Sequence, residues 1–334
     1  METYTAFRIH QDEAGHRAGF EQLPIPRPGP GEVLVRVAYS SVNYKDALAG
    51  TGRGKILRTF PLVGGIDAAG TVEASEDPAF RPGDAVIATG WGLSFDHDGG
   101  YAELLCVPAS WLVPMPEGLD ARTAMILGTA GFTAALAVHR MLTNGQTPAL
   151  GPILVTGASG GVGCVAIALF ARLGYEVVAL SGKAALADWL HRIGATRILG
   201  RDALADAKRP LERARWGGAV DNVGGELLAQ ITRTLAPHGN IASIGLAGGH
   251  QLETTVMPFI LRGVSLLGCN SVDVPQPLRR TLWEHLATDW RPADLDALLS
   301  KTLDFADLPE VFDDMLAGQT HGRVLVKIAP STQP

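Results

Sequence analysis

The stretch ILVTGASGGVGCVAIALFARLGYEVVALSGK, residues 153–183, decides the expected fold. An apolar run leads into a glycine-rich turn, a helix-like segment follows, and a second apolar run closes the stretch. This order is typical of strand, phosphate-binding turn, helix and strand, which is the first half of a dinucleotide-binding fold. Gly160 and Gly163 allow the backbone to approach a pyrophosphate, while free N–H groups at the helix start face the anion. The segment is therefore predicted to hold a nucleotide.

The second apolar run ends at Ser181, Gly182 and Lys183. An NAD site usually presents Asp or Glu at this point, about twenty residues after the turn, to bind the ribose 2′-hydroxyl. A carboxylate would repel a 2′-phosphate, whereas a hydroxyl, a glycine N–H and an ammonium group can all donate to one. The sequence thus favours NADPH over NADH. The alternative is that Lys183 is a solvated lysine at a helix start.

The chain before this segment has a different character. Short β-rich runs between residues 20 and 113 (EVLVRVAYS, AAGTVEAS, DAVIATG, YAELLCVP) are separated by proline and glycine turns, which predicts a compact, partly open β-barrel. From residue 153 onward, strand and helix candidates alternate, which predicts six parallel strands. The final run HGRVLVKIA is expected to return to the first domain. The predicted fold class is α/β, with domains at 1–123 plus 268–334 and at 124–267.

Composition limits the classes of function. The 334 residues are 46% hydrophobic, enough for two domains with cores, and the net charge of −6 argues against nucleic acid as a partner. We expect no membrane span, because no stretch approaches about 20 apolar residues, and no signal peptide in residues 1–14. A cytoplasmic enzyme is the resulting prediction. Three scattered cysteines (Cys106, Cys164 and Cys269) offer no disulfide framework and are expected to be small buried hydrophobes.

The order of these features resembles the medium-chain dehydrogenase/reductase superfamily, in which a Rossmann domain is inserted into a GroES-like catalytic domain. The motifs PxPGPGEVLVRV, NYKD, GGIDAAG, RPGDAV, GGYAE, LGTAGFTA, VTGASGGVG and HGRVLV carry the resemblance over nearly the whole chain. NYKD from Asn43, GGID from Gly64, SGK from Ser181 and CNSV from Cys269 look like its acryloyl-CoA reductase branch. That branch uses NADPH without zinc, within the quinone-oxidoreductase-like group.

The motifs also bear on zinc. Zinc-dependent relatives place a cysteine after the VRV strand, a His-Glu pair in the turn corresponding to residues 64–67, and four clustered cysteines in a structural lobe. This chain has Ser41, Val42 and Asn43 after the strand, Gly65-Ile66-Asp67 in the turn, and no cysteine cluster. We therefore predict catalysis without a metal. Asp96-His97-Asp98 is interpreted as an acidic surface loop rather than a ligand cluster.

The resemblance implies site residues in both domains. Tyr44 is placed beside the nicotinamide, where a phenol can stack, donate a hydrogen bond or relay a proton; the alternative is a half-buried barrel tyrosine. Asn43 could orient a carbonyl, and Asp67 could order the tyrosine loop or a water, or be only a turn residue. Lys45 and Asp46 are expected to form a local ion pair and helix start.

Cofactor contacts are implied at a larger set of positions. Arg201 would join Lys183 at the 2′-phosphate, unless it is only solvated, and Leu246 and Ile260 would lie near the nicotinamide half, unless they are core residues. The full set is Tyr44, Thr129, Ser159, Gly160, Gly161, Val162, Ser181, Gly182, Lys183, Arg201, Leu246, Ile260, Asn270, Ser271 and Arg323.

Substrate choice follows from charge. A CoA thioester carries phosphates, and Arg53, Lys55 and Arg58 in TGRGKILRTF supply a cationic loop for them, unless that loop is only solvated. A quinone reductase would need an aromatic slot, and with 6% aromatic residues the sequence shows no evident cluster.

The sequence therefore predicts NADPH-dependent reduction of a short α,β-unsaturated acyl-CoA, acryloyl-CoA first, by a homodimer that pairs edge strands, with VSLLGCNS as the candidate edge. A quinone or enone reductase and a non-catalytic NADPH-binding protein remain the alternatives.

Overall fold

The computed structural model describes residues 2–328 and divides them into two compact units. The barrel unit contains residues 2–129, 272–287 and 299–328, and the nucleotide unit contains residues 130–271 and 288–298. Residues 268–271 and 288–298 thus group with the nucleotide unit, and residues 124–129 with the barrel unit. The sequence-based division had assigned all of 268–334 to the first domain and 124–267 to the second.

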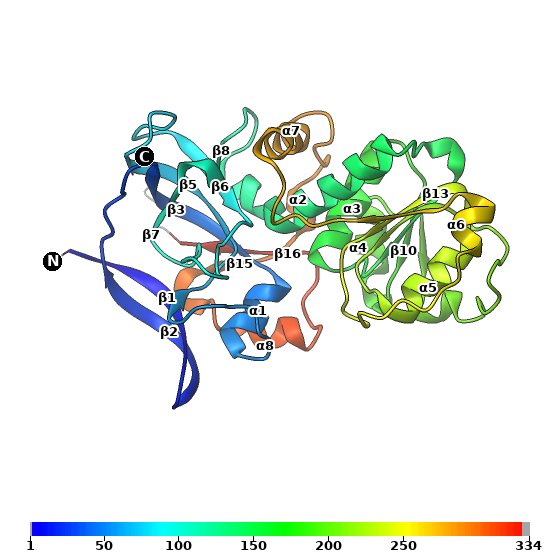
Figure 1. The fold of residues 1–334 in the computed structure, drawn as a ribbon, viewed down its shortest axis with the longest axis horizontal. Helices are drawn as coiled ribbons and strands as arrows, with labels where there is room; N and C mark the ends of the chain where they lie inside the picture. The colour runs from blue at the N-terminus through cyan, green and yellow to red at the C-terminus, as the bar shows by residue number, and fades with distance from the viewer. Residues whose placement is uncertain (1, 329–334) are drawn as a thin grey trace. The chain divides into compact units, whose positions relative to one another are not determined.

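Two sheets form the barrel unit. A seven-stranded sheet has the order β15-β16-β3-β5-β6-β8, with β7 paired to β3, and a three-stranded sheet has the order β2-β1-β4 (Figure 1). The elements of this unit are β1 (Thr3–Asp12), β2 (Gly15–Pro24), β3 (Glu32–Val42), α1 (Tyr44–Thr51), β4 (Leu62–Val63), β5 (Asp67–Ser75), β6 (Ala85–Thr89), β7 (Leu104–Pro108), β8 (Leu112–Pro114), α7 (Gln276–Ala287), β15 (Leu299–Asp304), α8 (Glu310–Leu316) and β16 (Arg323–Lys327).

Strand β3 organises the barrel sheet, because it pairs with β5, β7 and β16. Its apolar residues Val33, Leu34, Val35 and Val37 are buried, which accounts for its near-continuous hydrophobic run. The antiparallel pairing of β16 with β3 confirms that the last strand returns to the first domain.

The nucleotide unit contains a six-stranded sheet whose strands are all parallel, in the order β11-β10-β9-β12-β13-β14. The elements are β9 (Ile153–Thr156), α3 (Gly161–Arg172), β10 (Val177–Leu180), α4 (Ala187–Arg192), β11 (Arg197–Leu199), β12 (Trp216–Asp221), α5 (Gly225–Thr234), β13 (Leu235–Ser243), α6 (Met257–Arg262) and β14 (Ser265–Gly268). This is the doubly wound order, so the predicted α/β class with a GroES-like barrel and a Rossmann sheet is confirmed. A doubly wound sheet binds ligands beyond the carboxyl ends of its strands where the order reverses, here between β9 and β12.

The helix α2 (Ala121–Thr143) is two helical segments that meet at Gly128, whose φ of 52° and ψ of −157° are not helical. Contrary to the sequence-based expectation, α2 is long and apolar enough to cross a membrane by length and composition alone. However, 78% of its most apolar window is buried within the structure, as in a core helix, so length and composition support a membrane span only weakly.

Candidate active site

The glycine-rich turn joins β9 to α3. Gly157 has a φ of +57°, in the region that favours glycine. A Cβ at Gly163 would lie 2.3 Å from the Gly157 carbonyl oxygen, so helix and strand can approach this closely only without a side chain. Helix α3 begins at Gly161 with Gly160 as its N-cap, and Ser159 lies in the turn just before it. Unpaired N–H groups at such a helix start favour a phosphate.

A carboxylate that sequence reasoning missed fixes the strand before this turn. Asp221, at the end of β12, is fully buried and accepts hydrogen bonds from Thr156 Oγ1 at 2.7 Å and from the Gly224 N–H at 2.8 Å. The next residue, Asn222, donates its Nδ2 to the Thr156 carbonyl oxygen at 2.8 Å. Burial raises the pKa of Asp221. The sequence did offer a signal for Asp221 and Asn222, because both are polar and lie at the end of a buried strand where the strand order reverses.

The predicted 2′-phosphate residues converge at the end of β10. Ser181 Oγ accepts a hydrogen bond from the Lys183 N–H at 3.2 Å. The Arg201 side chain crosses Gly182 so closely that a Cβ there would lie 2.3 Å from Arg201 Nε. Burial, followed by the positive charge of Arg201, lowers the pKa of Lys183. Two cations thus meet above a glycine, and a phosphate group would offset their repulsion.

The residues assigned to the nicotinamide half are more dispersed. Leu246 and Ile260 are 68% and 71% exposed, which excludes the alternative that they belong to the core. Asn270 and Ser271 follow β14, and Thr133 Oγ1 donates to Ser271 Oγ at 2.8 Å. The role of these residues in binding the cofactor stays a prediction.

In the barrel unit, the Asp67 carboxylate is the centre of a buried polar cluster. Asp67 is the first residue of β5 and is fully buried. Its oxygens accept hydrogen bonds from Ser41 Oγ at 2.5 Å, from Asn43 Nδ2 at 2.8 Å, and from Thr129 Oγ1 and N–H at 2.5 and 2.9 Å. Three predicted site residues (Asn43, Asp67 and Thr129) therefore form one constellation.

Arg323 completes this cluster. It is 2% exposed and donates to Ser41 Oγ at 2.8 Å, to Asn43 Oδ1 at 3.2 Å and to the Ile126 carbonyl oxygen at 2.8 Å. Ser41 and Asn43 therefore bridge the arginine to the Asp67 carboxylate. A Cβ at Gly128 would lie 2.6 Å from Asp67 Oδ2 and 2.7 Å from Ser41 Oγ, so this glycine, which the sequence analysis did not single out, makes room for the cluster.

The cluster holds the start of the helix that carries Tyr44. Asn43 is the N-cap of α1 and Tyr44 is its first residue. Because Asn43 Nδ2 donates to Asp67 and Asp46, its amide hydrogens are engaged within the protein rather than offered to a substrate carbonyl. Tyr44 is 53% exposed at a helix start of the barrel unit, which fits both an active-site phenol and the half-buried barrel tyrosine considered as the alternative.

Asp46 differs most from its predicted role. The helix start is confirmed, but Asp46 is 2% exposed and its oxygens accept from Asn43 and from the Ile66 N–H, so the expected surface ion pair with Lys45 is wrong. Burial, followed by the nearby charge of Asp67, raises the pKa of Asp46 to about 7. The Tyr101 hydroxyl donates to the Ser41 carbonyl oxygen at 3.1 Å, and burial places the pKa of Tyr101 well above 10.

The cationic loop predicted for CoA phosphates is partly engaged. Arg53 forms an ion pair with Asp313 at 2.7 Å, while the Arg58 guanidinium lies 4.3 Å from the centre of the Phe95 ring. Lys55 and Arg58 are exposed, as they must be if this loop binds the phosphates of CoA.

The barrel unit also contains an aromatic cluster that was not evident from the sequence. The rings of Trp91 and Trp111 are parallel within 6°, with centroids 6.3 Å apart, and His97 meets Trp111 edge-on. The Arg279 guanidinium lies 4.8 Å from the Trp91 ring centre. These groups pack on one another, so this contact does not form the flat slot that a quinone would need.

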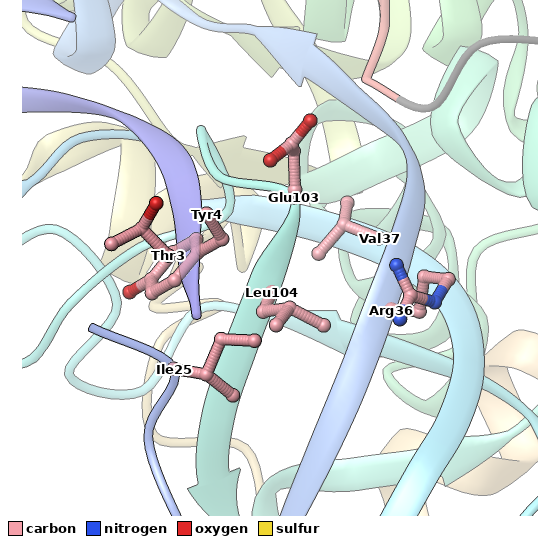
Figure 2. A pocket seen from close by; sticks show the side chains of 7 residues that line it. All are labelled: Thr3, Tyr4, Ile25, Arg36, Val37, Glu103 and Leu104. Carbon is pink, nitrogen blue, oxygen red and sulfur yellow. The ribbon is translucent and has the colours of Figure 1, made fainter. Parts of the chain in front are cut away.

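None of the site residues named above lines a small cavity of about 140 Å³ in the barrel unit (Figure 2). Its charged side chains are engaged: Arg36 pairs with Glu73 at 2.9 Å, and Glu103 accepts from the Thr5 N–H at 2.7 Å. It is lined by Thr3, Tyr4, Ile25, Arg36, Val37, Glu103 and Leu104. We assign no site to it.

Two family models match the chain: the alcohol dehydrogenase GroES-like domain over residues 29–117 and the zinc-binding dehydrogenase domain over residues 161–288. The acrylyl-CoA reductase AcuI of Ruegeria pomeroyi is 47% identical over 328 residues, covering 97% of this chain and 99% of the relative. The chain belongs to the acryloyl-CoA reductase branch of the medium-chain dehydrogenase/reductase superfamily.

Two further members of this superfamily are similar along most of their length. The putative quinone oxidoreductase YhfP of Bacillus subtilis is 46% identical, covering 91% of this chain and 92% of the relative, and the crystal structure of yhfP with NAD bound has a TM-score of 0.94. The yhdH oxidoreductase of Salmonella enterica, solved in complex with NADP, is 46% identical over 97% of this chain and 100% of that chain, with a TM-score of 0.93.

The superfamily includes zinc enzymes, and one of the matching models is named for zinc. Within residues 2–328, no group of three or more His, Cys, Asp or Glu side chains is arranged to hold a metal ion. Asp96 and Asp98 are exposed, as expected for a surface loop, and Asp98 Oδ1 accepts from the Val63 N–H at 2.8 Å. Catalysis without a metal stays a prediction for this reductase.

The first test asks whether Lys183, which lies close to Arg201, binds the 2′-phosphate of NADPH. Replacing Lys183 with Ala removes a charge-assisted donor to the 2′-phosphate, so we expect the Kd for NADPH to rise about 10-fold or more, from roughly 1.5–3 kcal/mol per such bond. The Kd for NADH should change little, and Lys208→Ala, an exposed lysine of the same unit, should affect neither. Calorimetric titration gives both constants, and equal weakening for the two nucleotides would contradict the assignment.

The second test concerns Gly128. Gly128→Ala places a methyl group on a backbone conformation that is nearly exclusive to glycine, and that methyl also contacts Asp67 and Ser41. We therefore expect the free energy of unfolding to fall by about 3 kcal/mol or more. Gly83 also has positive φ, at +95°, but an added Cβ there meets nothing within 4 Å. Gly83→Ala should therefore cost only about 1 kcal/mol of backbone strain. Similar losses in urea unfolding would show that the cluster tolerates the added methyl.

Proposed function

We propose that this protein reduces the C=C bond of a short α,β-unsaturated acyl-CoA with NADPH, acryloyl-CoA being converted to propanoyl-CoA. The observation that carries the proposal is 47% identity to acrylyl-CoA reductase AcuI across nearly the whole of both chains. The NADP-bound yhdH oxidoreductase and the cation pair at Gly182 support the choice of cofactor.

The proposed reaction requires positioning and charge stabilisation rather than a metal. Bound NADPH supplies a hydride, which the β-carbon of the acyl group accepts. Negative charge then collects on the thioester carbonyl oxygen as an enolate, and the α-carbon takes a proton, so acryloyl-CoA, NADPH and H⁺ give propanoyl-CoA and NADP⁺. We propose Tyr44 as the active-site phenol, because its exposed ring stands on a helix start that Asn43 and Asp67 hold in place.

For the CoA phosphates, the structure favours a subset of the predicted loop. All three side chains are exposed, but Arg53 already pairs with Asp313. We therefore propose that Lys55 and Arg58 contribute more than Arg53 to binding of the anionic handle.

A quinone or enone reductase is the second candidate, and the name of the Bacillus subtilis relative is the observation that favours it. An NADPH-binding protein without turnover is the third hypothesis. Substrate turnover distinguishes all three.

We further propose a cytoplasmic homodimer. β14 is an edge strand of the nucleotide sheet. Three apolar side chains near it are exposed: Leu266 on β14, Leu261 on α6, and Val256 just before α6. An uncovered edge strand flanked by such side chains suits pairing with a second copy.

The third test is NADPH oxidation at 340 nm with acryloyl-CoA, crotonyl-CoA and a benzoquinone, measured side by side. We expect acryloyl-CoA to have the highest kcat/KM, with Lys55→Ala and Arg58→Ala raising its KM more than Arg53→Ala. The Arg53 variant serves as the matched control, because it removes the same charge from a paired position.

Turnover of the quinone with acryloyl-CoA idle would overturn the substrate assignment. Binding of NADPH without oxidation of any substrate in the panel would instead favour the non-catalytic hypothesis.

A further inference from the structure

Asp46 is a buried carboxylate that the chemistry described above does not use. It is the third residue of α1 and is 2% exposed. Its Oδ2 accepts hydrogen bonds from the Asn43 N–H at 2.8 Å and from Asn43 Nδ2 at 3.1 Å, and its Oδ1 accepts from the Ile66 N–H at 3.0 Å. One side chain thus connects the helix start to the turn that precedes Asp67.

These contacts bear directly on Tyr44. Both the N–H and the amide of Asn43, the residue before Tyr44, are held by Asp46, and the same amide is shared with Asp67 at 2.8 Å. The Ile66 contact fixes the other side of the connection, one residue before Asp67. Asp46 therefore determines the backbone from which the tyrosine projects.

A capping box accounts for part of this arrangement, because Asn43 at the N-cap and Asp46 at the third helical position each bond the other's backbone. It accounts neither for the bond from the Ile66 N–H nor for the burial of a carboxylate near a second one, Asp67, which costs hydration. The three N–H donors compensate for part of that cost. The buried Asp46 carboxylate is unfavourable for stability and lies next to a proposed active-site side chain, which indicates a role in the reaction.

We propose that Asp46 is a positioning residue for the reduction, acting through Asn43 and Ile66 to hold the start of α1 and so to place Tyr44. This inference rests on the proposed function, because it assigns Tyr44 to the reacting groups.

The charged surroundings make this role dependent on pH. Burial, and then the charge of Asp67 on β5, raises the pKa of Asp46 to about 7. The other groups that face it are Tyr101, whose pKa lies well above 10, and, through the shared cluster, Arg323 on β16. Below the pKa of Asp46, the protonated acid is a poorer acceptor for the Asn43 and Ile66 N–H groups. Activity should therefore fall as the pH falls through the region near 7.

The test compares wild type, Asp46→Asn and Asp307→Asn, the last being an exposed acid of the same unit. With acryloyl-CoA as substrate from pH 5.5 to 8.5, we expect wild-type kcat to fall on the acid side. Asp46→Asn should have a kcat at least 10-fold lower at pH 8, no acid limb near pH 7, and a KM for NADPH within 2-fold of wild type. Asp307→Asn should follow wild type. An Asp46→Asn variant with wild-type kcat and the same acid limb would overturn the proposal.

A second measurement does not require turnover. In ¹H–¹⁵N spectra, the amide shifts of Asn43, Tyr44 and Ile66 should titrate together with one apparent pKa in wild type and stop titrating in Asp46→Asn. A wild type that never oxidises NADPH but shows this joint titration would refute the proposed reaction while supporting the hold of Asp46 on Tyr44. Amides that do not titrate, or that titrate equally in the variant, would overturn the role of Asp46 whatever the activity.

Discussion

The buried carboxylate of Asp67 is the constraint on which the barrel-unit site depends. A fully buried negative charge is stable only when several donors face it, and Ser41, Asn43 and Thr129 supply them. The three donors come from β3, from the residue before α1 and from α2, so one charge fixes segments distant in sequence. Arg323 supplies the opposite charge and donates to Ser41 and Asn43, which in turn donate to the carboxylate.

The nucleotide unit follows a comparable principle at the end of its parallel strands. Asp221 fixes Thr156 at the base of the phosphate-binding turn, so a buried carboxylate again holds backbone in place beside a proposed ligand position. At the end of β10, by contrast, two cations lie close together, and the charge of Arg201 contributes to the lowered pKa of Lys183. An anion bound beside Lys183 and Arg201 would reduce their mutual repulsion, as expected for a phosphate site.

The sequence predicted the architecture well, because glycine turns, strand periodicity and motif order are local signals. The family resemblance implied that Lys183 and Arg201 meet, and the parallel pairing of β10 with β11, the strands that precede them, brings them together. The sequence could not predict the inward turn of Asp46, because a carboxylate next to Lys45 looks like a surface ion pair until burial is known. The stacking of Trp91 on Trp111 and the pairing of Arg53 with Asp313 were equally hidden, since they depend on tertiary contacts between separated segments.

The central claim, that the Asp67 charge holds the barrel-unit site together, is tested most directly by hydrogen exchange in Asp67→Asn. The Thr129 N–H donates to both carboxylate oxygens, at 2.9 and 3.1 Å. We predict that the variant exchanges this amide and those of Asp46 and Ala47 at least 10-fold faster, while amides of β9 and β12 exchange at the wild-type rate. Unchanged exchange at Thr129 and in the first turn of α1 would contradict the account.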